Sequence, residues 1–286
     1  MPLTIGSNIA SLNTQRFLER ATAQLGRSYE RLSSGQRINR ARDDAAGLAI
    51  AEVLKADQRV ATVAIRNAND GISVVAIVDS ALGEIGNVLA RLAELAEQSA
   101  NGVFSTVQRS ALQSEFAALG SEIERIALTT EFNGVKLLSG QANIAFQVGF
   151  NSQSTSQVIF NGVQGTLASI GLAQVGSSAL SFSINDVTNA AGQSAAQLAL
   201  DAVRAAITSL TNNRGTLGAV ESRLQISIDN LQVARENFAA AESRIRDVDV
   251  ASEAAELTRV SILQQAGASV LAQANQQPAL ALRLLQ

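Results

Sequence analysis

The chain has 286 residues, of which 47% are hydrophobic and only 3% aromatic. It contains no histidine and no cysteine, which excludes imidazole and thiolate metal sites, disulfides, and Ser-His or Cys-His nucleophiles. A formal net charge of -3, with arginines interleaved among acidic residues, gives no basic surface for nucleic acid. The excess of small and aliphatic side chains over rings instead indicates long helices in close contact.

The first predicted element is an N-terminal helix whose leucines recur at every seventh position, at Leu18, Leu25 and Leu32. A stripe this narrow cannot be buried within one helix, so the helix is marginal in water unless a partner covers it. The residues before it lack the basic, apolar and small-residue order of a secretory signal peptide. We therefore expect any export to use another route.

A charged segment, RLSSGQRINRARDDAAG, runs from Arg31 to Gly47. We expect Gly35 to end the first helix and Asp43 or Asp44 to cap the next. Either its arginines reach neighbouring subunits, or it is a solvated connection whose exposed ion pairs contribute about 0 to 1 kcal/mol each. It lacks the lysine-serine ending of a phosphate-binding loop, so we expect no nucleotide there. The candidate residues for subunit contacts are Arg31, Arg37, Arg40, Arg42, Asp43 and Asp44.

Two long heptad stripes give the strongest signal. The first consists of Leu54, Ala61, Ala68, Val75, Leu82, Leu89 and Ala96. The second consists of Ala196, Val203, Leu210, Leu217, Leu224, Leu231, Phe238 and Ile245. The first stripe keeps its phase through the turn-like pair Asp70-Gly71, which predicts one helix of about 55 residues and about 80 Å. Because the stripes match in length, we expect the two helices to pack against each other.

The region between these stripes contains a third helix and then a change of pattern. Ser105 and Gln108 form a capping-box signature ahead of an apolar stripe that includes Phe116 and Ile123. From about residue 143 to 184 the runs AFQVGF, QVIF and LSFSI alternate or are β-branched, and polar turn residues separate them. These runs predict a small group of strands.

The last predicted element is a C-terminal helix that follows RIRDVDVASE. Asp247 and Asp249 could hold a divalent cation, although a helix break with an N-capping aspartate is the favoured interpretation. The apolar stripe of this helix consists of Val260, Leu263, Gly267, Val270 and Ala274. The uncharged stretch between Arg259 and Arg283 contains several amide side chains, so we expect no membrane span.

Several stretches of the chain together resemble the bacterial flagellins. They are LSSGQRINRARDDAAGLAI (Leu32 to Ile50), RNANDGISV (Arg66 to Val74), QSANG (Gln98 to Gly102), EFNGVKLLSG (Glu131 to Gly140), TLGAVESRL (Thr216 to Leu224) and SILQQAGASVLAQANQQP (Ser261 to Pro278). The matches cover both terminal thirds of the chain. Residues from about 141 to 194 carry almost no resemblance, which fits a family with a variable outer region.

The resemblance implies a mainly α fold, with long antiparallel helices in coiled-coil and bundle layers and a small β insert. Residues 1–40 and 251–286 would form the inner coiled-coil layer of a hollow filament. Residues 41–140 and 195–250 would form the helix bundle outside it. Residues 141–194 would be a short variable insert that belongs to this bundle or caps it.

The resemblance also implies function: a non-enzymatic subunit, without cofactor, that polymerises into the extracellular flagellar filament for swimming. Its terminal helices would fold as neighbouring copies cover them. The apolar candidates for these contacts are Leu18, Leu25, Leu32, Val260, Leu263 and Val270. Implied partners are other copies of the chain, an export chaperone on the C-terminal helix in the flagellar type III route, the filament cap and the hook-associated proteins.

Two other functions stay open at this point. A hook-filament junction protein shares flagellin-like ends but is present as a few copies at the filament base. A soluble coiled-coil protein that binds or signals to a partner would have little use for the β insert. Some flagellins carry O-linked sugars on central Ser and Thr residues, and nothing in this sequence selects such a site.

The resemblance extends to a stretch through which a host Toll-like receptor senses many flagellins. ARLAELAE, residues 90–97, aligns with that stretch, and Arg91, Leu95 and Glu115 match its contacting residue types. Ala90, Ala93 and Glu97 depart from the usual pattern. We therefore expect weakened receptor binding.

Overall fold

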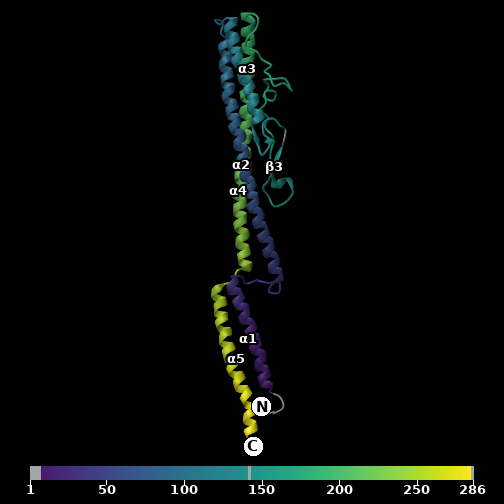
Figure 1. The fold of residues 1–286 in the computed structure, drawn as a ribbon, viewed down its shortest axis with the longest axis vertical. Coiled ribbons are helices and arrows are strands. Elements are labelled where there is room, and N and C mark those ends of the chain that lie inside the picture. The colour runs from purple at the N-terminus through teal and green to yellow at the C-terminus, as the bar shows by residue number, and fades with distance from the viewer. Residues whose placement is uncertain (1–7, 141–142, 285–286) are drawn as a thin grey trace. The chain divides into compact units, whose positions relative to one another are not determined.

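The computed structural model describes residues 8–140 and 143–284 of the chain (Figure 1). Its helices are α1 (Ile9–Ser34), α2 (Ala45–Ala100), α3 (Thr106–Thr129), α4 (Asn189–Arg246) and α5 (Val250–Leu284). Its short elements are β1 (Glu131–Phe132), β2 (Val135–Lys136), β3 (Ile144–Gln147), the 3-10 turn η1 (Ser154–Ser156) and β4 (Gln157–Phe160). The ends of the expected inner layer, residues 1–7 and 285–286, and residues 141–142 of the insert lie outside the described residues.

The chain divides into two compact units. One unit, which we call the terminal unit, comprises Met1–Gln58 and Glu236–Gln286. The other, the central unit, comprises Arg59–Arg235. Helices α2 and α4 contribute residues to both units because each continues across a boundary between them.

Both long helices predicted from the heptad stripes are confirmed. Helix α2 has 56 residues and is not interrupted at Gly71, and α4 has 58 residues. Gly71 lies in close packing, because a Cβ there would come within 3.1 Å of Leu224 Cδ1 and of Phe146 Cγ. This glycine therefore permits a close approach of side chains to α2 and does not mark a turn.

The core of the central unit lies where the apolar stripes of α2, α3 and α4 meet. The heptad residues buried there are Ala68, Val75, Leu82, Leu89 and Ala96 on α2, and Ala196, Val203, Leu210, Leu217, Leu224 and Leu231 on α4. Phe116 and Ile123 of α3 are buried in the same cluster, as predicted. The capping box also forms: Ser105 Oγ accepts from the Gln108 N–H, and the Gln108 side chain accepts from the Ser105 N–H.

The β structure is smaller than the sequence predicts and lies partly elsewhere. Strands β3 and β4 pair antiparallel, which confirms the first two predicted strands. The third prediction, LSFSI at residues 180–184, is wrong, because this segment has no strand partner. Helix side chains fix its end instead: the Ile184 N–H donates to Gln113 Oε1 at 2.7 Å, and the Ile184 carbonyl accepts from Ser99 Oγ at 2.5 Å.

A hairpin that the strand analysis did not predict follows α3. Strands β1 and β2 pair antiparallel around Asn133 and Gly134. Both residues have positive φ, 49° and 79°, which is typical of the two-residue turn that suits the twist of a hairpin. The strands have only two residues each, too few for alternation of hydrophobic residues to reveal them.

In the terminal unit, α1 and α5 lie side by side (Figure 1). Gly35 ends α1 in the left-handed region with φ 71°, as predicted. At the other end of α1, Asn8 caps the helix and its amide donates to the Ala274 carbonyl of α5 at 2.8 Å. The cap residue Asn8 therefore also links the first turn of α1 to α5.

Within the described residues, α2 is the one helix long and apolar enough to cross a membrane by length and composition alone. Its most apolar window has a mean hydropathy of 1.6. The apolar stripe of α2 forms the core of the central unit, and core helices of this kind pass the same test. Its hydropathy is therefore weak support for a membrane span.

Candidate functional site

The connection between α1 and α2 is held by its two aspartates. Asp44 Oδ1 accepts from the Gly47 N–H at 2.8 Å, so Asp44 is the cap of α2. Asp43 Oδ2 accepts from the Arg40 N–H at 3.0 Å and the Asn39 N–H at 3.3 Å. The backbone hydrogen bond from Arg40 is the main cause that lowers the pKa of the Asp43 carboxyl. Both aspartates thus fix the local backbone.

The arginines of this connection find partners inside the same chain. Arg31 pairs with Glu253 of α5 at 3.6 Å, and Arg40 Nε donates to Glu30 of α1 at 2.8 Å. Arg37 Nη2 donates to the Ile245 carbonyl of α4 at 2.7 Å. Arg42, whose side chain is 64% exposed, lies 3.9 Å from Asp43. The Arg42 side chain is therefore more accessible to another copy of the chain than those of Arg31 and Arg40.

Sequence reasoning missed Arg246, at the end of α4, as the central cation of this region. Its Nη1 lies 2.9 Å from Glu52 of α2, and its Nε donates to Gln36 Oε1 at 3.1 Å. Backbone bonds reinforce the contact: the Arg37 N–H donates to the Arg246 carbonyl at 2.6 Å, and the Val248 N–H donates to Gly35 O at 3.0 Å. No local pattern could reveal this, because the partners lie about two hundred residues away in sequence.

The stripe residues of the terminal helices divide into covered and uncovered sets. Val260 is only 2% exposed, and Leu18, Leu25 and Leu32 are half-buried along α1. Leu263 and Val270 are exposed by more than half. Further exposed apolar residues on the two helices, which heptad counting missed, are Ile9, Leu12, Phe17, Tyr29, Val250 and Ile262.

A groove of about 420 Å³ runs along the contact between these two helices. Its apolar lining includes Phe17 and Leu18 of α1 and Val260, Leu263 and Val270 of α5. Phe17 is 69% exposed, although a ring of this size is usually removed from water. We call the exposed apolar residues of α1 and α5, together with this groove, the terminal apolar face.

The three residues aligned with receptor contacts lie in the central unit but differ in exposure. Arg91 is accessible and donates to Glu94 and Glu115, each at 2.8 Å, and these bonds raise the pKa of Arg91. Leu95 is 0% exposed, within the core. The prediction for Leu95 is therefore corrected, because a side chain covered by the helix bundle cannot contact a receptor while the bundle is folded.

Arg109 of α3 is the second cation that sequence reasoning missed. Its side chain is 0% exposed and donates to three carbonyls. The acceptors are Ser99 at 2.8 Å, Asn101 at 3.0 Å and Asn189 at 2.8 Å. One guanidinium therefore joins the C-terminal end of α2 to the first residue of α4.

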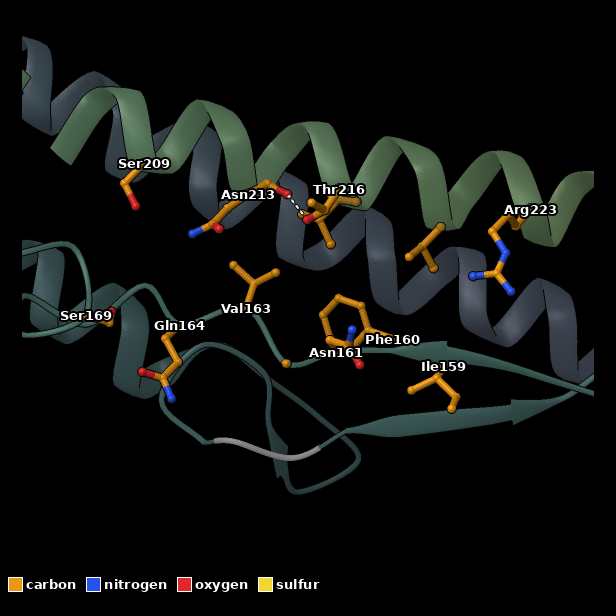
Figure 2. A pocket seen from close by; sticks show the side chains of 13 residues that line it. Ile159, Phe160, Asn161, Val163, Gln164, Ser169, Ser209, Asn213, Thr216 and Arg223 are labelled. Carbon is orange, nitrogen blue, oxygen red and sulfur yellow. Dashed lines mark hydrogen bonds between the residues drawn. The ribbon is translucent and has the colours of Figure 1, made fainter. Parts of the chain in front are cut away.

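A cavity of about 470 Å³ lies between α4 and the segment that follows β4 (Figure 2). Its polar lining includes Asn161, Gln164, Asn213 and Arg223. Figure 2 shows Asn213 and Thr216 on α4, and the Thr216 hydroxyl donates to the Asn213 carbonyl at 2.7 Å. Arg223 is the only charged residue in the lining.

The aspartates considered as metal ligands have helix-end roles. Asp249 Oδ1 accepts from the N–H groups of Ala251 at 3.0 Å and Ser252 at 3.2 Å, which caps α5 as predicted. Asp247 Oδ2 accepts from the Ser243 hydroxyl at 2.7 Å. Within the described part of the chain, no group of three or more acidic residues is placed to hold a metal ion.

Comparisons with known proteins decide the family. Family models match the bacterial flagellin N-terminal helical region over residues 5–143 and the C-terminal helical region over residues 200–285. The flagellin of Halalkalibacterium halodurans is 42% identical over 285 residues, covering 99% of this chain and 100% of that protein. The chain belongs to the bacterial flagellins. This flagellin is also 41% identical to that of Bacillus subtilis over 306 aligned residues, which cover 99% and 100% of the two chains.

Among solved structures, the crystal structure of Bacillus cereus flagellin covers 58% of this flagellin and 88% of its own chain, with 26% identity and a TM-score of 0.48. Flagellins form the extracellular flagellar filament. This flagellin is accordingly a structural subunit of that filament and not an enzyme. The full-length match to flagellins favours this role over the junction protein and the soluble coiled-coil protein.

Proposed function

We propose that this flagellin enters the filament through its terminal apolar face, and that α1 and α5 become fully ordered only when other copies cover that face. The observation that carries the proposal is the exposure of large apolar side chains on both helices, with Phe17, Leu263 and Val270 as its centre. Exposed apolar residues that form a continuous patch are typical of an interaction surface.

The energetics support coupling between folding and assembly. A pair of helices buries only the side that each presents to the other, so most of their apolar surface stays in water. Burying one Leu, Val or Phe side chain contributes about 1.5 to 3 kcal/mol. Neighbouring copies that cover several such residues would therefore supply free energy that α1 and α5 lack in the monomer.

Each segment of the chain would belong to one layer of the filament. Residues 1–40 and 251–286 would form the inner coiled-coil layer, and residues 41–140 and 195–250 would form the surrounding bundle, with 141–194 as its insert. The ion pairs of Arg31 and Arg246 would hold the connections of the terminal unit in a fixed geometry. Arg42, which is exposed, would contact a neighbouring subunit.

The same exposed face supports the proposed partners. An export chaperone would cover α5 before assembly, because Ile262, Leu263 and Val270 would otherwise promote premature association. Export in an incompletely ordered state suits the flagellar type III route. At the growing end the face would meet the filament cap, and at the base it would meet hook-associated proteins.

A truncation tests the proposal. Removing Ser261–Gln286 deletes Ile262, Leu263 and Val270 but leaves every residue of the central unit in place. We expect no filaments after addition of salt or short seeds, while circular dichroism still reports a folded helical bundle. Normal filaments from this truncated chain would contradict the proposal.

We also propose that recognition of this flagellin by a host Toll-like receptor rests on Arg91 and Glu115. These two side chains are accessible and bonded to each other, and buried Leu95 supports the helix beneath them. A reporter-cell assay against a standard flagellin should show reduced potency, and equal potency would contradict the expected weakening. The Arg91→Ala variant should reduce the remaining response further.

A further inference from the structure

We propose that Asn161 is a site of spontaneous deamidation in the folded chain. The sequence contains three Asn-Gly pairs, at Asn101, Asn133 and Asn161. Asparagine is chemically labile, and a following glycine removes the side chain that would hinder attack by the backbone. The three pairs are chemically equivalent in an unfolded chain, so differences among them must come from the fold.

The reaction needs only water. The backbone nitrogen of Gly162 bonds to Cγ of Asn161 and loses its proton to solvent, the Cγ–amide bond breaks, and ammonia leaves with a proton from solvent. The resulting five-membered imide is opened by water at either carbonyl, which yields aspartate or isoaspartate. The step requires rotation of the Asn161 backbone and side chain until nitrogen and Cγ meet. A residue held by hydrogen bonds reaches that geometry rarely.

The other two Asn-Gly pairs are held. Asn101 Oδ1 accepts from the Val103 N–H at 3.2 Å, and the Asn101 carbonyl accepts from buried Arg109 at 3.0 Å. Asn133 occupies the left-handed region with φ 49° inside the two-residue turn between β1 and β2. Each residue would have to break part of the native fold before its amide could react.

Asn161 is held less firmly. It is exposed and directly follows β4, in a segment without regular secondary structure. Within the described residues, its side-chain amide makes no hydrogen bond, and its backbone makes none outside regular elements. Figure 2 shows its side chain beside the cavity, next to Phe160. Phe160 and Val163 on either side are buried in the core, but rotation of the Asn161 side chain itself breaks no hydrogen bond.

The lining of the cavity also favours the negatively charged product of deamidation. Deamidation adds one negative charge to a lining whose only charged residue is Arg223. Among the described residues Arg223 has no ion pair within 4.0 Å, and its exposed side chain lines the same cavity as Asn161. Modification would thus convert a neutral amide into a partner for Arg223.

Peptide mapping by mass spectrometry tests the site with internal controls. The full-length chain is incubated as a monomer at mildly alkaline pH, and conversion to aspartate plus isoaspartate is followed at all three asparagines. We expect conversion at Asn161 to be at least ~10-fold faster than at Asn101 or Asn133 in the folded chain, and the three rates to converge in denaturant. Conversion at Asn161 that is no faster than at the other two in the folded chain would overturn the proposal.

Two variants test the mechanism and the pairing. Gly162→Ala should slow conversion at Asn161 without changing Asn101, and an unchanged rate would contradict attack by the residue 162 nitrogen. Asn161→Asp, which carries the product, should melt at or above the wild-type temperature. In an Arg223→Gln background the same substitution should lower the melting temperature. If Asn161→Asp changes the melting temperature equally with and without Arg223, the pairing of the new carboxylate with Arg223 is contradicted.

Discussion

Arg109 shows how one side chain can close the end of a helix bundle. Its guanidinium offers donors in a rigid planar fork, and its three acceptors are main-chain carbonyls near the end of α2 and the start of α4. The C-terminal carbonyls of α2 carry partial negative charge, which favours a cation there. No hydrophobic pattern predicts this residue, because the sequence around it resembles an ordinary exposed helix turn.

We predict that Arg109→Met destabilises the central unit by about 3 kcal/mol, since it removes the donor to the buried Ser99 carbonyl and to two partly buried carbonyls. Arg109→Lys should destabilise the central unit less than Arg109→Met, because the lysine ammonium can still donate to some of the three carbonyls. Denaturant unfolding measures both, with exposed Arg125→Met as the matched control, which should change stability by less than about 1 kcal/mol. Equal effects of the methionine variants would contradict the role of Arg109.

The ion pair between Asp79 of α2 and Arg214 of α4 gives a pH dependence. The hydrogen bond from Arg214, at 2.7 Å, is the main cause that lowers the pKa of Asp79 below its ordinary value of 3.8. A depressed carboxyl pKa stabilises the fold above pH 3.8, and this contribution is lost as the pH falls through the folded-state pKa.

Asp79→Asn should therefore lower the melting temperature slightly at neutral pH, because the pair is half-exposed and worth less than about 1 kcal/mol. The difference from wild type should vanish under acid conditions, as the wild-type carboxyl becomes protonated. A melting-temperature difference that persists or grows as the pH falls would contradict the assignment.

At the scale of elements, hydrophobic periodicity predicted the helices well, because burying one face of a helix requires apolar residues at regular spacing. Residues of one heptad stripe must face the same core, so the frame persists through Gly71, where a local turn signal would have divided α2. Strands were predicted less well, because a strand must pair with another segment, and the local sequence does not indicate which segment that is. LSFSI has the composition of a strand but meets side chains of α2 and α3, and the β1–β2 hairpin was too short to detect.

The capping box of α3 provides an element-scale prediction. Ser105→Ala removes the acceptor for the Gln108 N–H and should cost about 1 kcal/mol. Ser114→Ala, in the middle of the same helix, removes only a hydroxyl that donates to the Ser110 carbonyl and should be neutral or stabilising. Denaturant unfolding compares the two, and equal destabilisation would contradict the capping role.

At the scale of the whole molecule, the family and mainly α fold could be predicted from sequence, whereas the partners of individual charges could not. The arginines of the connection after α1 were identified as important, but their partners Glu253 and Ile245 lie more than two hundred residues away. Leu95 matched a surface motif by alignment and proved to be buried. A helix stripe predicts which face is covered, but it does not predict which segment of chain covers it.

Our central claim is that filament assembly depends on the terminal apolar face, the exposed apolar residues of α1 and α5. The most direct measurement is negative-stain electron microscopy of a chain carrying Phe17→Ser, Leu263→Ser and Val270→Ser, after addition of salt or filament seeds. Its matched control is Val175→Ser, which changes a residue that is 98% exposed in the central unit. Our account predicts that the triple variant forms no filaments while wild type and control form regular ones. Wild-type filaments from the triple variant would contradict it.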